Sequence, residues 1–156
     1  MTKAIFLDRD GVINKEIGRY VYLPADFIFN VELFERLIEF KKQGFIFIII
    51  SNQGGISKNI YSHKDVEVLN DLISLEFKKH KLEVAEFYYC PHHPYYENCI
   101  CRKPNSLLLE KAVARFNIDK SRSIFIGDAE RDIEAAQKVG IKGIKIEPNQ
   151  IHQIKL

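Results

Sequence analysis

The chain has 156 residues, of which 46% are hydrophobic and 28% are charged, and its formal net charge is +2. This is an ordinary globular composition, which excludes disordered and fibrous proteins, and the length suits one domain, residues 1–156. Lysine and arginine are scattered among acidic residues instead of forming a basic stripe, so we expect no nucleic-acid partner.

The N-terminal segment and the cysteines indicate a cellular compartment. Asp8 comes too early for the apolar core of a signal peptide, and the apolar run 45–50 is far too short to span a bilayer. All three cysteines lie between residues 90 and 101, and an odd number in one short window suits a metal site in a reducing compartment. We therefore expect a cytoplasmic monomer without membrane contact.

Short apolar runs alternate with segments of helical periodicity along the chain. The alternation predicts an α/β fold with a doubly wound, mainly parallel sheet that is covered by helices on both faces. The predicted strands are 4–7, 45–50, 87–89, 124–126 and 144–146, and helical spacing is found over 33–40, 66–77, 107–116 and 132–139.

Three local signals support the predicted helix ends. Ser62 and Asp65 have the spacing of a capping box at the start of the second helix. Gly44 and Gly140 follow the first and last helices, where glycine is the usual stop residue.

Polar side chains follow the first two predicted strands. In a doubly wound fold, ligands bind beyond the carboxyl ends of the strands. Asp8 and Asp10 come directly after the first strand, and clustered carboxylates are usually tolerated because a cation such as Mg²⁺ lies between them. Ser51 and Asn52 end the second strand with a hydroxyl and an amide that can bind phosphate oxygens.

Two later segments add charge at the same edge of the sheet. Arg102 and Lys103 follow the cysteine loop, while Asp128 ends the fourth strand and Asp132 lies one helical turn further on. Taken singly, these groups are equally well explained as turn, cap or surface residues. Together they supply a nucleophile, an acid or base, cation ligands and a cationic clamp, which phosphoryl transfer requires.

In this order, the four segments resemble the motifs of the haloacid dehalogenase superfamily of phosphotransferases over nearly the whole chain. The resemblance implies that Asp8 attacks phosphorus to form an aspartyl-phosphate, and that Asp10 protonates the leaving oxygen and later activates water. It also implies that Ser51 binds the phosphoryl group and that Lys103 neutralises charge on that group and on Asp8.

The resemblance further implies a catalytic Mg²⁺ ion. Its ligands would be Asp8, Asp128 and the main-chain oxygen of Asp10, with Asp132 orienting this set from behind. Each interval between motifs is filled by a helix, a strand and their connections. We therefore expect no sizeable cap domain.

The loop 90–105 has the form C-x-H, a short connection, then C-x-C. Three thiolates and one imidazole form a closed tetrahedral Zn²⁺ site that is structural, because no ligand position is left for water. His93 is an alternative to His92, although the one-residue gap between the later cysteines favours His92. The predicted zinc ligands are Cys90, His92, Cys99 and Cys101.

The loop sequence Tyr-Cys-Pro-His-His-Pro, followed by Cys-x-Cys-Arg-Lys-Pro, resembles D-glycero-D-manno-heptose 1,7-bisphosphate phosphatases. Asp-Arg-Asp-Gly, Ser-Asn-Gln and the Cys-Arg-Lys-Pro tail are also similar to the histidinol-phosphatase domain. The first resemblance implies a small phosphorylated sugar as substrate, with Arg102 reading a second anionic group, and histidinol phosphate is the alternative. The resemblance to the family leads us to expect a basic residue directly after Asp128. This chain departs from that pattern, because it has Ala129 there.

Two other classes of protein fit parts of the pattern. A receiver domain also combines acidic residues with Mg²⁺, but it would place its phosphorylated Asp after the third strand, where this chain has Tyr89-Cys90. A zinc-bearing interaction module that reads nucleic acid would need a recognition helix and a basic stripe. Neither class accounts for all the motifs.

Overall fold

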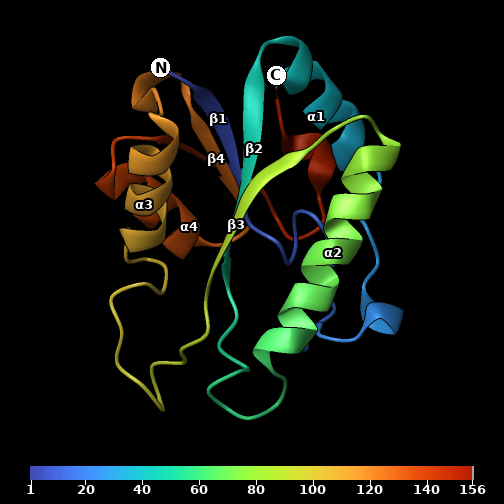
Figure 1. Ribbon diagram of the computed structural model, residues 1–156, viewed down its shortest axis with the longest axis vertical. Helices are drawn as coiled ribbons and strands as arrows, with labels where there is room; N and C mark the ends of the chain where they lie inside the picture. The colour runs from blue at the N-terminus through green and yellow to red at the C-terminus, as the bar shows by residue number, and fades with distance from the viewer. Residues whose placement is uncertain (156) are drawn as a thin grey trace.

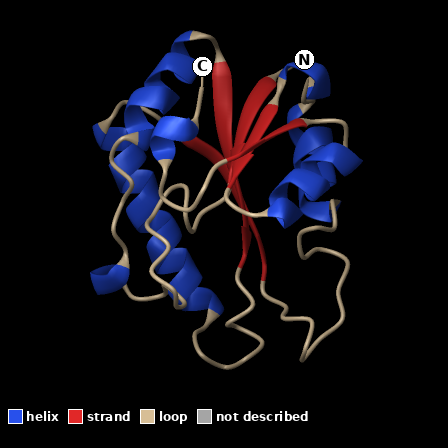
Figure 2. Ribbon diagram, turned by 180° about the vertical axis from the view of Figure 1, so that it is seen from behind, coloured by secondary structure: helices blue, strands red, loops and turns tan. Residues whose placement is uncertain are grey.

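The computed structural model describes residues 1–155, and its framework is a five-stranded sheet in the order β3-β2-β1-β4-β5 (Figures 1 and 2). Every pairing in the sheet is parallel, as predicted. The strands are β1 (Lys3–Leu7), β2 (Phe45–Asn52), β3 (Val84–Cys90), β4 (Ile124–Gly127) and β5 (Lys142–Lys145).

Two pairs of helices cover the two faces of the sheet (Figure 1). The pair α1 (Leu33–Lys42) and α2 (His63–Lys79) packs on one face, and the pair α3 (Leu107–Phe116) and α4 (Glu130–Lys138) packs on the other. Short 3₁₀ helices cover Pro24–Asp26, Lys120–Arg122 and Ile151–Gln153.

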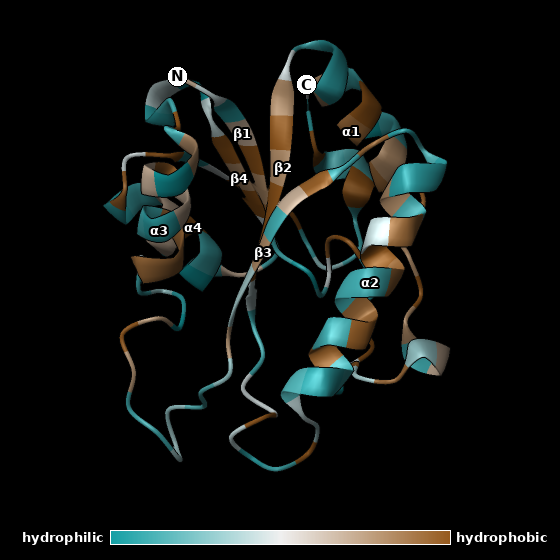
Figure 3. Ribbon diagram, in the orientation of Figure 1, coloured by the Kyte–Doolittle hydropathy of each residue, from teal (hydrophilic) through white to brown (hydrophobic). Residues whose placement is uncertain are grey.

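The central strand β1 divides the core in two. Its side chains alternate, so that Ile5 and Leu7 pack in the core under α1 and α2, while Ala4 and Phe6 pack in the core under α3 and α4. Because helices bury both sides of the strand, its residues have to be apolar throughout. Figure 3 shows this apolar centre between more hydrophilic helix surfaces.

The sequence placed the elements correctly but not all their boundaries. Strand β3 begins at Val84, three residues before the predicted range 87–89. The apolar pattern missed these residues because the strand lies at the edge of the sheet and carries the polar residue Glu86. Helix α4 begins at Glu130, two residues before the predicted start. The capping box is confirmed, since Ser62 Oγ accepts from the Asp65 backbone N–H at 3.3 Å and Asp65 Oδ2 accepts from that of Ser62 at 2.8 Å.

Two long loops lie side by side beyond the carboxyl ends of the strands (Figure 1). Loop 53–62 contacts loop 91–106 through Ser57, whose N–H donates to Pro91 O at 3.2 Å and whose Oγ accepts from His93 N at 2.7 Å. Within residues 1–155 there is no sizeable inserted cap, and no helix there has the length and apolarity to cross a membrane.

The turn after β1 depends on a glycine. Gly11 has a positive φ of 87°, and its N–H donates to Asn14 O at 2.8 Å. A Cβ atom at this position would lie 2.0 Å from Asp128 Oδ2. The turn can therefore approach the end of β4 this closely only because residue 11 has no side chain.

We predict that Gly11→Ala destabilises the protein much more than Gly44→Ala. Gly44 also has a positive φ, of 84°, but a Cβ there would meet nothing within 4 Å. The control should cost about 1 kcal/mol for backbone strain, and Gly11→Ala more than about 3 kcal/mol, because it also displaces Asp128. Denaturant unfolding measures both values, and equal losses would contradict the prediction.

Candidate active site

A cleft of about 480 Å³ opens at the carboxyl ends of β1, β2 and β4. It is lined by acidic and basic side chains, and titratable groups with shifted pKa values in a cleft are typical of functional sites. These side chains include Asp8, Asp10, Asp128, Arg102, Lys103 and Arg131.

Lys103 lies at the floor of the cleft as a buried cation, only 1% exposed. Its Nζ is 2.9 Å from Asp8 Oδ1 and 2.7 Å from Asp132 Oδ1, and it donates to Ile50 O at 2.8 Å. Burial opposes its charge, but the two carboxylates outweigh burial, so its pKa lies above the ordinary value for lysine. Lys103 is therefore a fixed positive charge beside Asp8.

Asp132 is fully buried, and both of its oxygens have a polar partner, although the contact of Oδ1 is an ion pair without hydrogen-bond geometry. Oδ1 pairs with Lys103, and Oδ2 accepts from the backbone N–H of Ala129 at 3.1 Å. Asp132 comes from the first turn of α4, so it ties the start of that helix to the lysine. This geometry suits the orienting role that the sequence indicated.

Asp8, Asp128 and Asp132 offer carboxylate oxygens that all lie within 4.8 Å of one another. Burial raises the pKa of Asp8, and the charges of Asp132 and Asp128 raise it further, although Lys103 acts in the opposite direction. Burial and the charge of Asp132 also raise the pKa of Asp128. A set of crowded oxygen donors fits a hard divalent cation such as Mg²⁺, which would offset this repulsion.

Asp10 lies at the edge of the cleft, with its side chain 25% exposed. Its Oδ1 accepts from Arg9 Nη2 at 3.0 Å and from Asn14 Nδ2 at 2.9 Å. Arg9 is almost fully buried and also donates to Val21 O at 2.7 Å. The arginine between the two acids therefore points inward and anchors Asp10.

The two predicted phosphate-binding residues of β2 are placed differently. Ser51 is almost fully buried, and its Oγ accepts from Gln53 Nε2 at 2.6 Å. The amide of Asn52 instead forms two hydrogen bonds with the backbone of Lys103: Oδ1 accepts from Lys103 N at 3.0 Å, and Nδ2 donates to Lys103 O at 3.1 Å. Asn52 thus holds the lysine in place, a contact that the sequence did not indicate.

Four residues around the cleft have no role predicted from the sequence: Arg9, Asn14, Gln53 and Tyr61. Gln53 had a usable signal, since alternation along β2 places it on the same side as Ser51. Arg9 also had one, as a charged residue between two acids at a strand end. Tyr61 had none, because nothing in its loop spacing indicates where its hydroxyl lies.

The remaining basic residues of the cleft come from two segments. Arg102 donates from Nη1 to His92 O at 3.0 Å, which holds it against the cysteine loop. Ala129 has only a methyl group where the family resemblance suggested a basic residue, but Arg131, two positions later, lines the same cleft. The cleft therefore retains a cation from this segment.

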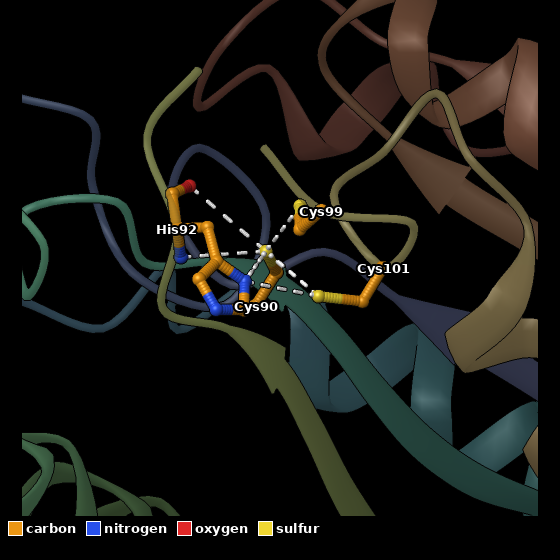
Figure 4. A group of neighbouring side chains, drawn as sticks. All are labelled: Cys90, His92, Cys99 and Cys101. Carbon is orange, nitrogen blue, oxygen red and sulfur yellow. Dashed lines mark hydrogen bonds between the residues drawn. The ribbon is translucent and has the colours of Figure 1, made fainter. Parts of the chain in front are cut away.

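The four predicted zinc ligands converge at one point (Figure 4). Cys90 Sγ is 3.1 Å from Cys101 Sγ and 3.7 Å from Cys99 Sγ, while His92 Nδ1 is 3.4 Å from Cys90 Sγ and 3.3 Å from Cys101 Sγ. Tetrahedral zinc requires about 3.8 Å between sulfurs and about 3.5 Å between sulfur and nitrogen. Three of the four distances lie within about 0.2 Å of these values, and the Cys90–Cys101 pair would have to open by about 0.7 Å, so the donor set fits Zn²⁺ after a small side-chain movement.

The structure distinguishes the two neighbouring histidines. His92 directs Nδ1 into the cysteine cluster, and its Nε2 lies 3.4 Å from Glu97 Oε2. A carboxylate on the far nitrogen is typical of metal-bound imidazoles. The ring of His93 instead packs edge-on against Tyr96, with 6.1 Å between ring centroids.

Comparisons with known proteins point to one family. A family model described as HAD-hydrolase-like matches residues 100–149. The D-glycero-alpha-D-manno-heptose-1,7-bisphosphate 7-phosphatase of Campylobacter jejuni is 41% identical over 140 residues, which are 90% of this chain and 79% of the relative. The D-glycero-beta-D-manno-heptose-1,7-bisphosphate 7-phosphatase of Haemophilus influenzae is 35% identical over 147 residues, which are 91% of this chain and 79% of the relative.

A solved structure agrees with these relatives. The D,D-heptose 1,7-bisphosphate phosphatase from B. bronchiseptica, crystallised with magnesium and phosphate, matches with a TM-score of 0.84 at 25% identity. The match covers 91% of this chain and 79% of that protein. The shared fold, the identity to several relatives and the cleft described above agree, and this chain belongs to the heptose-1,7-bisphosphate 7-phosphatase family of haloacid dehalogenase-like hydrolases.

Proposed function

We propose that this protein removes the 7-phosphate of D-glycero-D-manno-heptose 1,7-bisphosphate, with Asp8 as nucleophile. The observation that carries the proposal is the buried pair of Asp8 and Lys103 at the floor of an open, charged cleft. The relatives support the choice of substrate, since those from Campylobacter jejuni and Haemophilus influenzae are heptose-1,7-bisphosphate 7-phosphatases.

In the first half of the reaction, a carboxylate oxygen of Asp8 attacks phosphorus and the bond from phosphorus to the sugar oxygen breaks. Asp10 gives a proton to that leaving oxygen. Lys103 opposes the rise in the pKa of Asp8 and offsets negative charge on the transferring group, because its ammonium is held 2.9 Å from Asp8 Oδ1.

In the second half, the enzyme is regenerated by water. Asp10, now a carboxylate, takes a proton from a water molecule whose oxygen attacks the phosphorus of the aspartyl-phosphate. The bond to Asp8 breaks and inorganic phosphate leaves. Within residues 1–155, the Ser51 hydroxyl has no acceptor for its own hydrogen, which leaves it free to bind a phosphoryl oxygen.

Asp8, Asp128 and the main-chain oxygen of Asp10 would hold Mg²⁺. When bound, the ion supplies charge neutralisation to the phosphoryl oxygens. Asp132 stays with Lys103 and Ala129, so it orients this set without ligating.

The cysteine loop would hold a structural Zn²⁺. The loop leads directly into Arg102 and Lys103, so fixing its four ligands also fixes the path of these two cations. Asn52 clasps the same segment from β2. Arg102 and Arg131 would then bind the phosphate that the product keeps, since both line the cleft.

We predict that the protein with Mg²⁺ releases inorganic phosphate from heptose 1,7-bisphosphate, and that Asp8→Asn lowers kcat by more than about 10³-fold because the amide cannot attack phosphorus. Phosphate release should be measured with both anomers, histidinol phosphate and common sugar phosphates. Asp71→Asn, which changes an exposed acid on α2, serves as the matched control.

Preference for histidinol phosphate would contradict the proposed substrate while leaving the chemistry intact. Activity that survives Asp8→Asn would contradict the proposed nucleophile. The control variant should retain the kcat of the unchanged protein.

We predict that His92→Asn loses bound zinc and His93→Asn keeps it, because only the ring of His92 lies in the cysteine cluster. Metal content should be measured by atomic absorption after dialysis. In His92→Asn, the loss of one zinc ligand should leave the cysteine loop less ordered. Phosphatase activity should then fall about 10-fold to 100-fold, because Arg102 and Lys103 are misplaced. Equal zinc content in the two variants would show that the assignment of His92 is wrong.

A further inference from the structure

Tyr61 is a buried tyrosine in loop 53–62 that no motif accounts for. It is 7% exposed, and its hydroxyl donates to Gln53 Oε1 at 2.6 Å. A Cβ on Gly55 would lie 2.1 Å from the tyrosine ring, so the ring rests directly on that backbone. Tyr22 stacks on the same ring, with centroids 5.3 Å apart and planes at 13°. The hydroxyl is therefore held in one place.

Gln53 links this hydroxyl to the cleft. It is 2% exposed, and its backbone N–H donates to Cys90 O at 2.7 Å. With Oε1 taken by Tyr61, the other end of the amide faces the active groups: Nε2 donates to Ser51 Oγ at 2.6 Å and to Asp10 Oδ2 at 3.2 Å. Both hydrogens of the amide nitrogen are thus committed.

The direction of the amide is set by the tyrosine. Burial raises the pKa of Tyr61 to about 12, so the phenol keeps its proton and acts as a donor at neutral pH. A donor at this position selects the carbonyl end of Gln53 and turns the nitrogen toward Asp10 and Ser51.

The two oxygens of Asp10 are used unequally. Oδ1 accepts from Arg9 and Asn14, whereas Oδ2 accepts only from Gln53 among the described residues. Oδ2 is therefore the oxygen with room for the proton that passes to the leaving group. Ser51, in turn, accepts from Gln53 and so keeps its own O–H for a phosphoryl oxygen.

We propose that Tyr61, acting through Gln53, is a positioning residue for the proposed phosphatase reaction: it locks the amide so that Nε2 orients Asp10 Oδ2 and the Ser51 hydroxyl together. The inference rests on the proposed function. If the amide turned over, Oε1 would face the carboxylate of Asp10 and repel it. The Ser51 hydroxyl would then donate to Oε1 and be lost to the phosphoryl group.

The test compares Tyr61→Phe with Tyr22→Phe, using a poor and a good leaving group. The control, Tyr22→Phe, also removes a tyrosine hydroxyl from the same pair of stacked rings. No hydrogen bond of the Tyr22 hydroxyl is found within residues 1–155. The substrates are the heptose bisphosphate, whose alkoxide must be protonated, and p-nitrophenyl phosphate, whose phenolate needs little help. The quantity compared is kcat/KM, which covers the steps up to loss of the leaving group.

For Tyr61→Phe we expect kcat/KM to fall about tenfold with the sugar phosphate and less than about threefold with the aryl phosphate, since misplacing a general acid penalises the poorer leaving group. Tyr22→Phe should change neither value. Gln53→Met, which removes the bridge from its other end, should show the same bias and serves if Tyr61→Phe does not fold.

Equal losses with both substrates would overturn the inference and leave Tyr61 a packing residue. Unchanged kinetics in Tyr61→Phe and Gln53→Met would overturn it as well. Failure of the unchanged protein to hydrolyse either compound would be a different result, because it overturns the proposed function and the inference with it.

Discussion

The site depends on one buried ammonium group shared by two carboxylates. Lys103 is removed from water, which is tolerable only because Asp8 and Asp132 pair with it and Ile50 O accepts its remaining hydrogen bond. These partners come from the residue that follows β1, from β2 and from the first turn of α4. The lysine therefore requires three elements to be in register, and the two carboxylates require the lysine to be charged.

Two separate restraints hold the backbone that carries this lysine. The cysteine cluster closes the loop that leads into it, and the Asn52 amide binds its N–H and carbonyl. A flexible four-carbon side chain is a poor positioning group by itself, and two backbone restraints compensate for that. The same loop also holds Arg102 beside the cleft.

The fold and the main residues of the site could be predicted from the sequence, because the patterns that indicate them are local or repeated along the chain. Apolar runs of strand length predicted the parallel sheet, and the order of Asp8, Ser51, Lys103 and Asp128 predicted a common edge. The contacts of Asn52 and Tyr61 were not predictable. Their partners are set by how two loops pack, and loop packing leaves no periodic trace in the chain.

The order of the strands also determines when the site can exist. The first strand to be synthesised is the centre of the sheet, and its neighbour β4 comes from the far end of the chain: Ala4 N donates to Ser123 Oγ across 119 residues. Such non-local pairing forms late, since the intervening chain must first be closed into a loop. A nascent chain that stops short of Asp132 holds the nucleophile and Lys103 without the second carboxylate that pairs with the lysine, so catalytic competence is coupled to completion of the fold.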